Sequence, residues 1–238
     1  MARLIASASN PRLKLVRKLG TRRQREQLGL FVCEGEDLVE AALESGWELE
    51  AALVDGERPP ALELPRAERV EPKLLASVSR LGHTPRVIAI FRARQPQRER
   101  PALGLELWQV RDPGNVGTLA RAADGFGGYL ALSDGCADPF GPKALRASTG
   151  SIFRISLGEF SPEGCVALLS QGAPPLCDVD PRLSRFLLGS EREGLPDEVV
   201  ASCAATATIP LDDRAESLNV AMAGTIALYD WRRRHGSR

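Results

Sequence analysis

The sequence predicts an α/β protein in two parts: a small α/β domain at residues 1–94 and a larger domain at residues 103–238 with a mostly parallel sheet. Three observations support this fold class. The 238 residues are 43% hydrophobic and 26% charged, the composition of an ordinary folded protein. Short apolar runs alternate with helical patterns along the chain. The polar segment RQPQRERPA (94–102) interrupts this alternation, so we expect a linker at 95–102.

The first domain is expected to begin with a helix. Asn10 is a capping residue, and Pro11 suits the first helical turn. The apolar residues that follow at helical spacing are Leu13, Val16 and Leu19. The other expected elements are a helix at 36–44, a buried strand at 49–55, a helix at 71–82 and a strand at 87–93. This alternation of helices and strands indicates a small α/β domain.

The second domain contains four apolar runs that we expect to be strands, at 103–110, 128–134, 185–191 and 205–211. Helical patterns lie between them, at 116–124, 142–147, 162–170 and 195–202. A last helix is expected from Ser217, with an apolar face of Leu218, Ala221, Met222, Thr225, Ile226 and Tyr229. Strands separated by helices favour a parallel sheet covered on both faces. Periodicity alone predicts an unknotted, doubly wound sheet.

The formal net charge is zero, but the charges are unevenly distributed. Residues 1–30 hold eight basic residues and one acidic residue, whereas residues 31–72 hold three basic and twelve acidic residues. Arginine binds phosphate through a planar fork, so the first segment suits a nucleic-acid backbone. A solvated helix face that balances the acidic stretch explains the charge alone equally well. The candidate nucleic-acid-binding residues are Arg12, Arg17, Arg22, Arg23 and Arg25.

The cysteines are Cys33, Cys136, Cys165, Cys177 and Cys203. They show no C-x-x-C spacing, and neither histidine lies beside them, so we expect no metal site and interpret the thiols as small buried side chains. No apolar run approaches the roughly 20 residues that span a bilayer. The N-terminus lacks the apolar core of a signal peptide, so we expect a cytoplasmic protein with no membrane segment.

The first of three motifs, RDPGNVGTLARAADGFGG (111–128), directly follows an expected strand. Its glycines make a tight turn that exposes backbone N–H groups at the start of a helix. Such a turn is common in α/β proteins. Its combination with Asn115 and Arg121 beside an anion-binding turn is unusual and indicates function. An ordinary surface position is the alternative interpretation for Arg121.

The other two motifs also follow expected strands. FLLGSEREGLP (186–196) places Glu191 at a strand end, the edge at which open α/β sheets bind ligands. In IPLDDRAESLNVAMAGTIALYDW (209–231), Ser217 is the expected helix N-cap. Asn219 then lies in the first helical turn, where asparagine is a mediocre helix former and capping does not explain it.

Together the three motifs resemble the signature motifs of the SpoU-type RNA 2′-O-ribose methyltransferases of the SPOUT superfamily. The matching patterns are N-x-G-x-x-x-R-x-A-x-x-F-G at 115–127, L-G-S-E-x-x-G-L at 188–195 and I-P-x(6)-S-L-N-V-A at 209–221. GPKALRASTGSIFRI (141–155) resembles the segment that follows the family's first motif. FVCEGEDLVEAAL (31–43) and the basic helix before it resemble the family's substrate-binding domain.

This resemblance implies an RNA ribose 2′-O-methyltransferase that uses S-adenosylmethionine as cofactor. It implies a trefoil knot in the C-terminal domain and an N-terminal substrate-binding domain related to a ribosomal-protein (L30e-like) fold. It also implies a homodimer with active sites near the interface. By analogy with the family, ribosomal RNA is favoured over transfer RNA as the substrate, with a role in rRNA processing.

The resemblance also assigns candidate site residues. The implied catalytic and structural polar residues are Asn115, Arg121, Glu191, Ser217 and Asn219. The implied cofactor-binding residues are Leu188, Gly189, Ser190, Ile209, Leu211, Ser217 and Leu218. A guanidinium keeps its proton, which disfavours Arg121 as a base. We therefore hypothesise that Arg121 binds the adjacent phosphate and lowers the pKa of the ribose hydroxyl, with base action as the alternative. Asp213 stands where the family usually has a glycine, and a carboxylate there is expected to affect the cofactor loop.

Two other functions are weighed against this one. A non-catalytic RNA-binding or ribosome-assembly protein with the same fold would not need the full set of polar residues. A nicotinamide-dependent oxidoreductase is disfavoured, because the first motif lacks G-x-G-x-x-G. The enzyme is therefore the preferred hypothesis.

Overall fold

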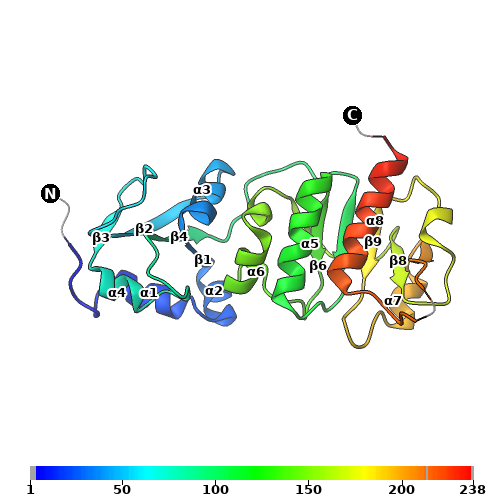
Figure 1. Ribbon diagram of the computed structural model, residues 1–238, viewed down its shortest axis with the longest axis horizontal. Helices are drawn as coiled ribbons and strands as arrows, with labels where there is room; N and C mark the ends of the chain where they lie inside the picture. The colour runs from blue at the N-terminus through cyan, green and yellow to red at the C-terminus, as the bar shows by residue number, and fades with distance from the viewer. Residues whose placement is uncertain (1–3, 213, 237–238) are drawn as a thin grey trace. The chain divides into compact units, whose positions relative to one another are not determined.

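The structure of the protein, a computed structural model, describes residues 4–212 and 214–236. Helices and strands alternate along the chain (Figure 1), which confirms the predicted α/β class. In this described part, no helix is long and apolar enough to cross a membrane.

The chain packs as two compact units. The first unit comprises the chain up to Pro96 together with Phe140–Arg154. The second comprises Gln97–Pro139 and the chain from Ile155 onward. The expected domain bounds at 1–94 and 103–238 remain a prediction.

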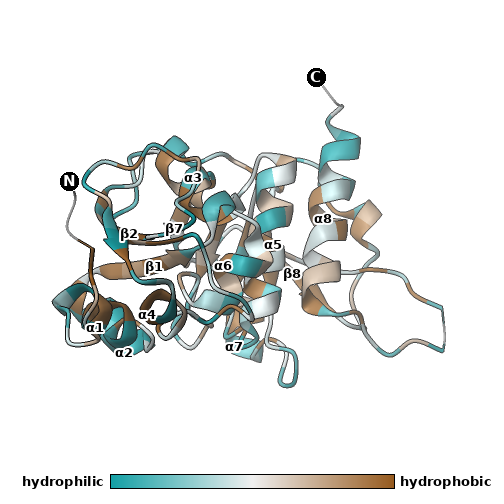
Figure 2. Ribbon diagram, turned by 60° about the vertical axis from the view of Figure 1, so that its left-hand side comes forward, coloured by the Kyte–Doolittle hydropathy of each residue, from teal (hydrophilic) through white to brown (hydrophobic). Residues whose placement is uncertain are grey.

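A four-stranded sheet forms the centre of the first unit, in the order β1-β4-β2-β3. Its strands are Leu30–Glu34 (β1), Leu49–Asp55 (β2), Glu68–Val70 (β3) and Val87–Arg92 (β4). β4 is antiparallel to both β1 and β2, whereas β2 and β3 are parallel. The hydrophobic character of β1 and β2 is visible in Figure 2. Phe31, Leu53 and Ile90 are fully buried, so this sheet carries the core of the unit.

The helices of the first unit are Pro11–Lys18 (α1), Arg22–Leu28 (α2), Glu36–Glu44 (α3), Pro72–Ala76 (α4) and Pro142–Ser148 (α6), with a 3-10 turn at Ser151–Phe153 (η1). α1 begins as predicted, because Asn10 Oδ1 accepts a hydrogen bond of 2.8 Å from the backbone N of Arg12. Its Leu13 and Val16 are buried against the core. α3 has the predicted bounds.

The predicted helix at 71–82 is wrong beyond its first turns, since α4 ends at Ala76. The carboxylate of Glu34 accepts hydrogen bonds from Ser79 Oγ at 2.6 Å and from the backbone N of Arg80 at 2.8 Å. These bonds hold the chain in a turn instead of a helix. Tertiary contacts thus override a local helical pattern. α2, β1 and β3 were not predicted.

The second unit is built on a parallel sheet, and its described strands have the order β10-β8-β9-β5-β6-β7. They are Gly104–Leu107 (β5), Tyr129–Leu132 (β6), Leu157–Glu159 (β7), Val166–Leu169 (β8), Arg185–Leu188 (β9) and Ala205–Thr208 (β10). Each strand is parallel to its neighbours, so the predicted mostly parallel sheet is confirmed. The trefoil knot and the ribosomal-protein relationship of the first domain stay predictions.

The helices of the second unit are Pro113–Phe126 (α5), Asp197–Ala201 (α7) and Val220–Arg234 (α8), with a 3-10 turn at Leu176–Asp178 (η2). α5 and α8 lie side by side (Figure 1). Gly224 of α8 permits this close packing, because a Cβ there would lie 2.5 Å from Leu119 Cδ2 and 2.7 Å from Leu188 Cδ1. This packing holds the start of α8 beside the sheet.

Two predictions for the second unit are wrong. The expected helix at 162–170 contains β8, because a short apolar run does not distinguish a buried strand from a helix. The last helix begins at Val220 with Asn219, not Ser217, as its N-cap. The expected apolar face of that helix is exposed in part, since Met222 and Tyr229 are 55% and 56% exposed. β7 was not predicted.

Candidate functional site

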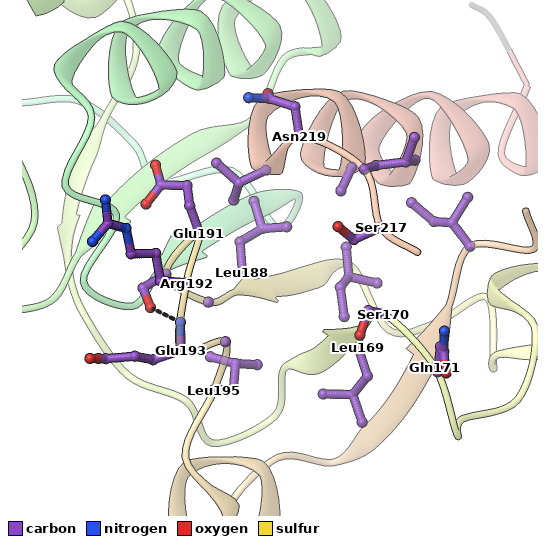
Figure 3. Close-up of a pocket in the computed structure, with 18 of the residues that line it drawn as sticks. Leu169, Ser170, Gln171, Leu188, Glu191, Arg192, Glu193, Leu195, Ser217 and Asn219 are labelled. Atoms are coloured by element: carbon purple, nitrogen blue, oxygen red, sulfur yellow. Dashed lines mark hydrogen bonds between the residues drawn. The ribbon is translucent and has the colours of Figure 1, made fainter. Parts of the chain in front are cut away.

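The candidate site lies at the carboxyl edge of the parallel sheet of the second unit. There the segments that follow β8, β9 and β10 meet the N-terminal ends of α5 and α8 and enclose two neighbouring cavities. Ligands of open α/β sheets bind at this edge. Figure 3 shows the side chains that line the first of these cavities.

The start of α5 fixes the position of Asn115. Asp112 caps this helix, and its Oδ1 accepts hydrogen bonds from the backbone N of Gly114 at 2.6 Å and of Asn115 at 3.1 Å. Pro113 follows the cap, where a missing N–H costs nothing. Asn115 therefore lies in the first turn of α5, with its side chain facing the segment after β9.

Asn219 has a structural role that the sequence did not reveal. As the N-cap of α8, its Oδ1 accepts hydrogen bonds from the backbone N of Ala221 at 2.9 Å and of Met222 at 3.4 Å. Capping thus explains an asparagine at this position. Its Nδ2 then donates to Asn115 Oδ1 at 3.2 Å, which joins the starts of α5 and α8.

Asn115 completes a chain of hydrogen bonds by donating from Nδ2 to Glu191 Oε1 at 2.8 Å. The direction of every bond follows from the cap. Only the Asn219 oxygen accepts from backbone N–H groups, so its amide nitrogen must donate to the Asn115 oxygen. The Asn115 nitrogen is then left to donate to the carboxylate. Asn219, Asn115 and Glu191 therefore form one oriented unit from three separate motifs.

The first cavity has a volume of about 700 Å³ and lies beside this polar unit. All of the residues predicted to bind cofactor line it: Leu188, Gly189, Ser190, Ile209, Leu211, Ser217 and Leu218. Glu191 and Asn219 line it as well. Leucine and isoleucine side chains supply apolar walls, and serine hydroxyls supply polar groups, which is the composition expected of a small-molecule pocket.

A tight loop after β9 shapes one wall of this cavity. The backbones of Ser190 and Gly194 exchange hydrogen bonds of 3.1 and 3.2 Å, and Gly194 has a φ of +68°. Gly189 lies so close to this closure that a Cβ would be 2.4 Å from the carbonyl carbon of Gly194. Glycine is therefore required at position 189 for the loop to close.

Several lining residues were missed by the sequence analysis: Leu168, Leu169, Ser170, Gln171, Arg192 and Leu195. The first four belong to the end of β8 and the residues after it, which were expected to be helical. A strand assignment at 166–169 would have placed them at the sheet edge. In Figure 3, Ser170 and Gln171 lie on one side of the cavity, and the side chains of Glu191, Arg192 and Glu193 extend on the other.

Arg121 does not join the other predicted catalytic residues in this chain. It is exposed on α5 and lines neither cavity. Asn115 and Arg121 are six residues apart, which places their side chains about 120° apart around the helix. Among the described residues, Arg121 has no hydrogen-bond or ion-pair partner. Its predicted role at this site therefore needs a contribution from outside the chain.

The five candidate RNA-binding arginines lie in the first unit and differ in their availability. Arg25 is 7% exposed and donates to the backbone O of Leu19 at 2.8 Å, so its guanidinium closes α1 and is not available to RNA. Arg12 is partly buried and forms an ion pair of 3.4 Å with Glu68. Arg17, Arg22 and Arg23 are exposed, although Arg17 donates to Ser77 Oγ at 3.2 Å and Arg22 pairs with Glu26 at 2.6 Å.

The cysteines differ in their burial. Cys33, Cys136 and Cys165 are buried as expected, whereas Cys177 is exposed. No cluster of His, Cys, Asp or Glu side chains within residues 4–212 and 214–236 is arranged to hold a metal ion. Asp213 lies outside the described residues. The Arg214 guanidinium holds the pKa of Asp212 below its ordinary value.

Comparisons with known proteins identify the family of this chain. Residues 102–229 match the SpoU rRNA methylase family, and residues 10–89 match the MRM3-like substrate binding domain. The 23S rRNA (uridine(2479)-2′-O)-methyltransferase of Streptomyces viridochromogenes is 32% identical, over 89% of this chain and 85% of that protein. The 23S rRNA (guanosine(2553)-2′-O)-methyltransferase of Bacillus subtilis is 31% identical, over 96% of this chain and 98% of that protein.

A solved structure shares the fold over nearly the whole chain. It is the AdoMet-bound rRNA methyltransferase of Sinorhizobium meliloti, with a TM-score of 0.86 and 28% identity. The similarity covers 99% of both chains.

Proposed function

This chain belongs to the SpoU rRNA methylase family, and from this premise we propose that it transfers the methyl group of S-adenosylmethionine to a ribose 2′-hydroxyl of ribosomal RNA. The observation that carries the proposal is the oriented Asn219–Asn115–Glu191 unit at the rim of the first cavity. A binding protein would have no need to hold a carboxylate in one orientation beside a pocket. Relatives with this activity act on 23S rRNA, which supports a ribosomal substrate.

The residues of the first cavity fit the cofactor. Leu169, Leu188 and Ile209 offer apolar walls for a heterocyclic base, and the hydroxyls of Ser170 and Ser217 offer polar partners for sugar or amino-acid groups. The volume of about 700 Å³ is within the range of small-molecule sites. When bound, S-adenosylmethionine supplies an electrophilic methyl group. We assign all seven residues predicted to bind cofactor to that role: Leu188, Gly189, Ser190, Ile209, Leu211, Ser217 and Leu218.

Glu191 is suited to act on the ribose hydroxyl. Asn115 occupies its Oε1, and Oε2 has no partner among the described residues. The hydroxyl must lose its proton as its oxygen becomes a nucleophile, and a carboxylate within hydrogen-bond reach accepts that proton. Asn115 and Asn219 are positioning residues in this scheme, because they hold the carboxylate through hydrogen bonds. Ser217 lines the cofactor side of the same cavity.

Arg121 is proposed to act from a second copy of the chain. It is exposed on α5, and the neighbouring α8 exposes Met222 and Tyr229, which are 55% and 56% accessible. Large exposed apolar side chains favour a protein interface on these helices. A homodimer built through them would bring Arg121 of one copy toward the cavity of the other. There its charge would bind phosphate and lower the pKa of the ribose hydroxyl.

We propose that the domain at 1–94 binds folded rRNA and presents it to the catalytic domain at 103–238. Arg17, Arg22 and Arg23 are exposed on or beside α1 and α2 and are the best candidates for contacts with the RNA backbone. A ribosomal substrate supports a cytoplasmic location, where such an enzyme would act during rRNA processing.

Methyl transfer tests the proposed activity directly. Purified protein is incubated with methyl-labelled S-adenosylmethionine and total RNA from a host that lacks the protein, alongside the Glu191→Gln variant. We expect label in rRNA with the wild type and little with the variant. The label should survive alkali in a dinucleotide, since a 2′-O-methyl group blocks cleavage. Absence of cofactor binding by the wild type would overturn the proposal.

Mixed dimers test the origin of Arg121. Arg121→Ala and Glu191→Gln should each be inactive alone. If Arg121 acts across the interface, dimers that contain one chain of each kind have one intact site, and random mixing restores about a quarter of wild-type activity. If Arg121 acts within its own chain, mixing restores none. Sedimentation analysis of each variant checks that the dimer itself is retained.

A further inference from the structure

The second cavity adjoins the first and has a different composition. Its lining comes from the start of the first motif and from the loop after β9: Arg111, Asp112, Asn115, Ser190, Glu191, Arg192, Glu193 and Asn219. The residues shared with the first cavity are Ser190, Glu191, Arg192, Glu193 and Asn219. The carboxylate of Glu191 therefore faces two connected spaces, one of which fits the cofactor.

Each acidic residue of the second cavity has at least one partner, although Glu191 Oε2 has none among the described residues. Asp112 Oδ1 caps α5, and Glu191 Oε1 accepts the hydrogen bond from Asn115. Glu193 lies 4.0 Å from the guanidinium of Arg111, the outer limit of an ion pair. Arg111 also donates to Gln109 Oε1 at 3.0 Å.

Arg192, in contrast, carries a free charge. Among the residues that the structure describes, its guanidinium has neither a hydrogen-bond nor an ion-pair partner, and the side chain is exposed. In Figure 3 it extends on the same side as Glu191, away from Ser170 and Gln171 across the first cavity. A guanidinium offers five N–H donors in a planar fork that matches phosphate oxygens. Arg192 lines both cavities beside Glu191, so its charge suits an anionic ligand in the second cavity next to the cofactor site.

We propose that the second cavity holds the target nucleotide and that Arg192 binds the phosphate next to the ribose, with Arg111 as a second phosphate contact. This inference rests on the proposed function, because the ligand is the RNA substrate of that same site. It adds a phosphate contact from this chain's own site to the one proposed above for Arg121 of a second copy. The starts of α5 and α8 meet beside the cavity, and their positive ends also favour a phosphate there.

The salt dependence of RNA binding tests the proposal. Binding of a short fluorescein-labelled single-stranded RNA to the full chain is measured over a range of salt concentrations. Each phosphate contact contributes about 0.7 to the slope of log K against log salt for single strands. Arg192→Gln is therefore expected to reduce the slope by about 0.7, and Arg111→Gln with Arg192→Gln by about twice that amount. Arg192→Lys keeps the charge and should restore most of the slope.

Two matched variants sharpen the result. Arg182→Gln removes another exposed arginine of the second unit, which is paired with Asp180, and should leave the slope unchanged. Glu193→Gln frees Arg111 from its acidic neighbour and should tighten RNA binding at low salt. Affinity for S-adenosylmethionine is measured for every variant, because Arg192 and Glu193 also line the first cavity, and it should match the wild type in Arg182→Gln. In methyl transfer, Arg192→Gln should raise KM for RNA more than it lowers kcat.

The outcomes separate this inference from the proposed function. An unchanged salt slope in Arg192→Gln, or a loss confined to cofactor affinity, overturns the phosphate assignment while wild-type methyl transfer still stands. Wild-type binding of RNA with the expected slope, but without any methyl transfer, overturns the proposed function and leaves the anion site supported.

Discussion

The side chains of Asn115 and Glu191, 76 residues apart in the sequence, are joined by a hydrogen bond of 2.8 Å from Nδ2 to Oε1. One residue lies in the first turn of α5 and the other in the loop after β9, so the bond ties two motifs together at the sheet edge. Asn219 extends the arrangement with a bond of 3.2 Å to Asn115. The catalytic proposal depends on this orientation of the carboxylate more than on any single residue type.

Replacing Glu191 with Gln should separate charge from structure. The glutamine oxygen can still accept the bond from Asn115, so the fold and its melting temperature should be close to wild type. The lost carboxylate no longer accepts the ribose proton, and general-base action contributes about 10²–10⁴-fold. We expect kcat for methyl transfer to fall within that range while affinity for S-adenosylmethionine changes little. Glu198→Gln, an exposed acid of α7, is the matched control and should keep full activity.

Two substitutions at Asn219 should distinguish its role as the N-cap of α8 from its hydrogen bond to Asn115. Asn219→Ala removes the cap of α8 and should lower the free energy of unfolding by roughly 0.5–2 kcal/mol. Asn219→Ser keeps a capping oxygen, so its free energy of unfolding should fall only by the lost bond to Asn115 and remain above that of Asn219→Ala. Both lose the donor to Asn115, worth roughly 0.5–1.5 kcal/mol, and kcat should fall about two- to tenfold.

Urea unfolding and methyl-transfer kinetics on the two Asn219 variants check this division. If Asn219→Ser is as active as wild type, the bond to Asn115 has no part in orienting Glu191. If Asn219→Ala is fully stable, the cap contributes nothing measurable.

Much of the fold could be predicted because local signals and tertiary structure agree. Asn10 and Pro11 start α1, and apolar runs identify β2 and β4. The prediction fails where a distant side chain decides the conformation. The Glu34 carboxylate accepts hydrogen bonds from Ser79 Oγ and the backbone N of Arg80, and α4 ends before them. A local sequence pattern does not contain this contact, because Glu34 lies 45 residues away from Ser79.

The candidate site likewise combines residues that the sequence predicted with residues that it missed. Glycine-rich strand ends indicated Asn115 and Glu191, which lie where loops of a parallel sheet converge. β8 was missed because Val166–Leu169 is a short apolar run without alternation, and its neighbours in the cavity were missed with it. Arg192 carries no sequence signal of its own. Its proposed role follows from its position, because it lines both cavities and has no hydrogen-bond or ion-pair partner among the described residues.

Gly189→Ala should weaken cofactor binding. A Cβ at this position would lie 2.4 Å from the carbonyl carbon of Gly194 and 2.6 Å from its oxygen, so the loop after β9 must shift. That shift moves the wall made by Leu188 and Ser190. We expect the Kd for S-adenosylmethionine to rise at least about tenfold, equivalent to roughly 1.4 kcal/mol, in calorimetric titration.

Gly82→Ala is the control for Gly189→Ala, since no heavy atom lies within 4 Å of a Cβ there. It should bind cofactor as the wild type does. Wild-type affinity in Gly189→Ala would show that this loop does not shape the cofactor site.

A buried network should dominate the stability of the second unit. Glu106 is fully buried, and its Oε1 accepts hydrogen bonds from Arg185 at 2.8 Å, Tyr129 at 2.6 Å and Arg100 at 2.9 Å. Glu106→Gln removes the charge that compensates two arginines and should cost about 3–5 kcal/mol in unfolding free energy. Tyr129→Phe removes a hydroxyl that donates to Glu106 and accepts from Arg185 Nε at 2.9 Å, and should cost about 1.5–3 kcal/mol because both partners are charged.

Urea denaturation measures both costs. The strands that bear the network begin at Gly104, Tyr129 and Arg185, and the candidate site lies at the opposite ends of the sheet's strands. Activity per folded molecule should therefore remain near wild type in Tyr129→Phe. Equal costs for the two variants would contradict the view that the buried charge is the dominant contribution.

The thiols should differ sharply in reactivity. Cys165 is fully buried, and burial raises its pKa from 9.0 to about 12, whereas Cys177 is exposed. Because the thiolate is the reactive form, iodoacetamide at about pH 8 should label Cys177 in the folded protein and reach Cys165 only after unfolding. Peptide mass spectrometry before and after urea treatment measures this order. Labelling of Cys165 in the folded state at the rate of Cys177 would contradict its burial.

The same shift predicts how stability depends on pH. Below pH 9 the Cys165 thiol is protonated in both the folded and the unfolded chain, so its contribution is constant. Above pH 9 the unfolded chain loses this proton while the folded protein keeps it up to about pH 12. The free energy of unfolding therefore falls in that window by up to about 1.4 kcal/mol per pH unit. Cys165→Ala removes this contribution, so the difference in unfolding free energy between wild type and variant should shrink as the pH rises above 9. A difference that stays constant through this window would show that Cys165 ionises equally well in both states.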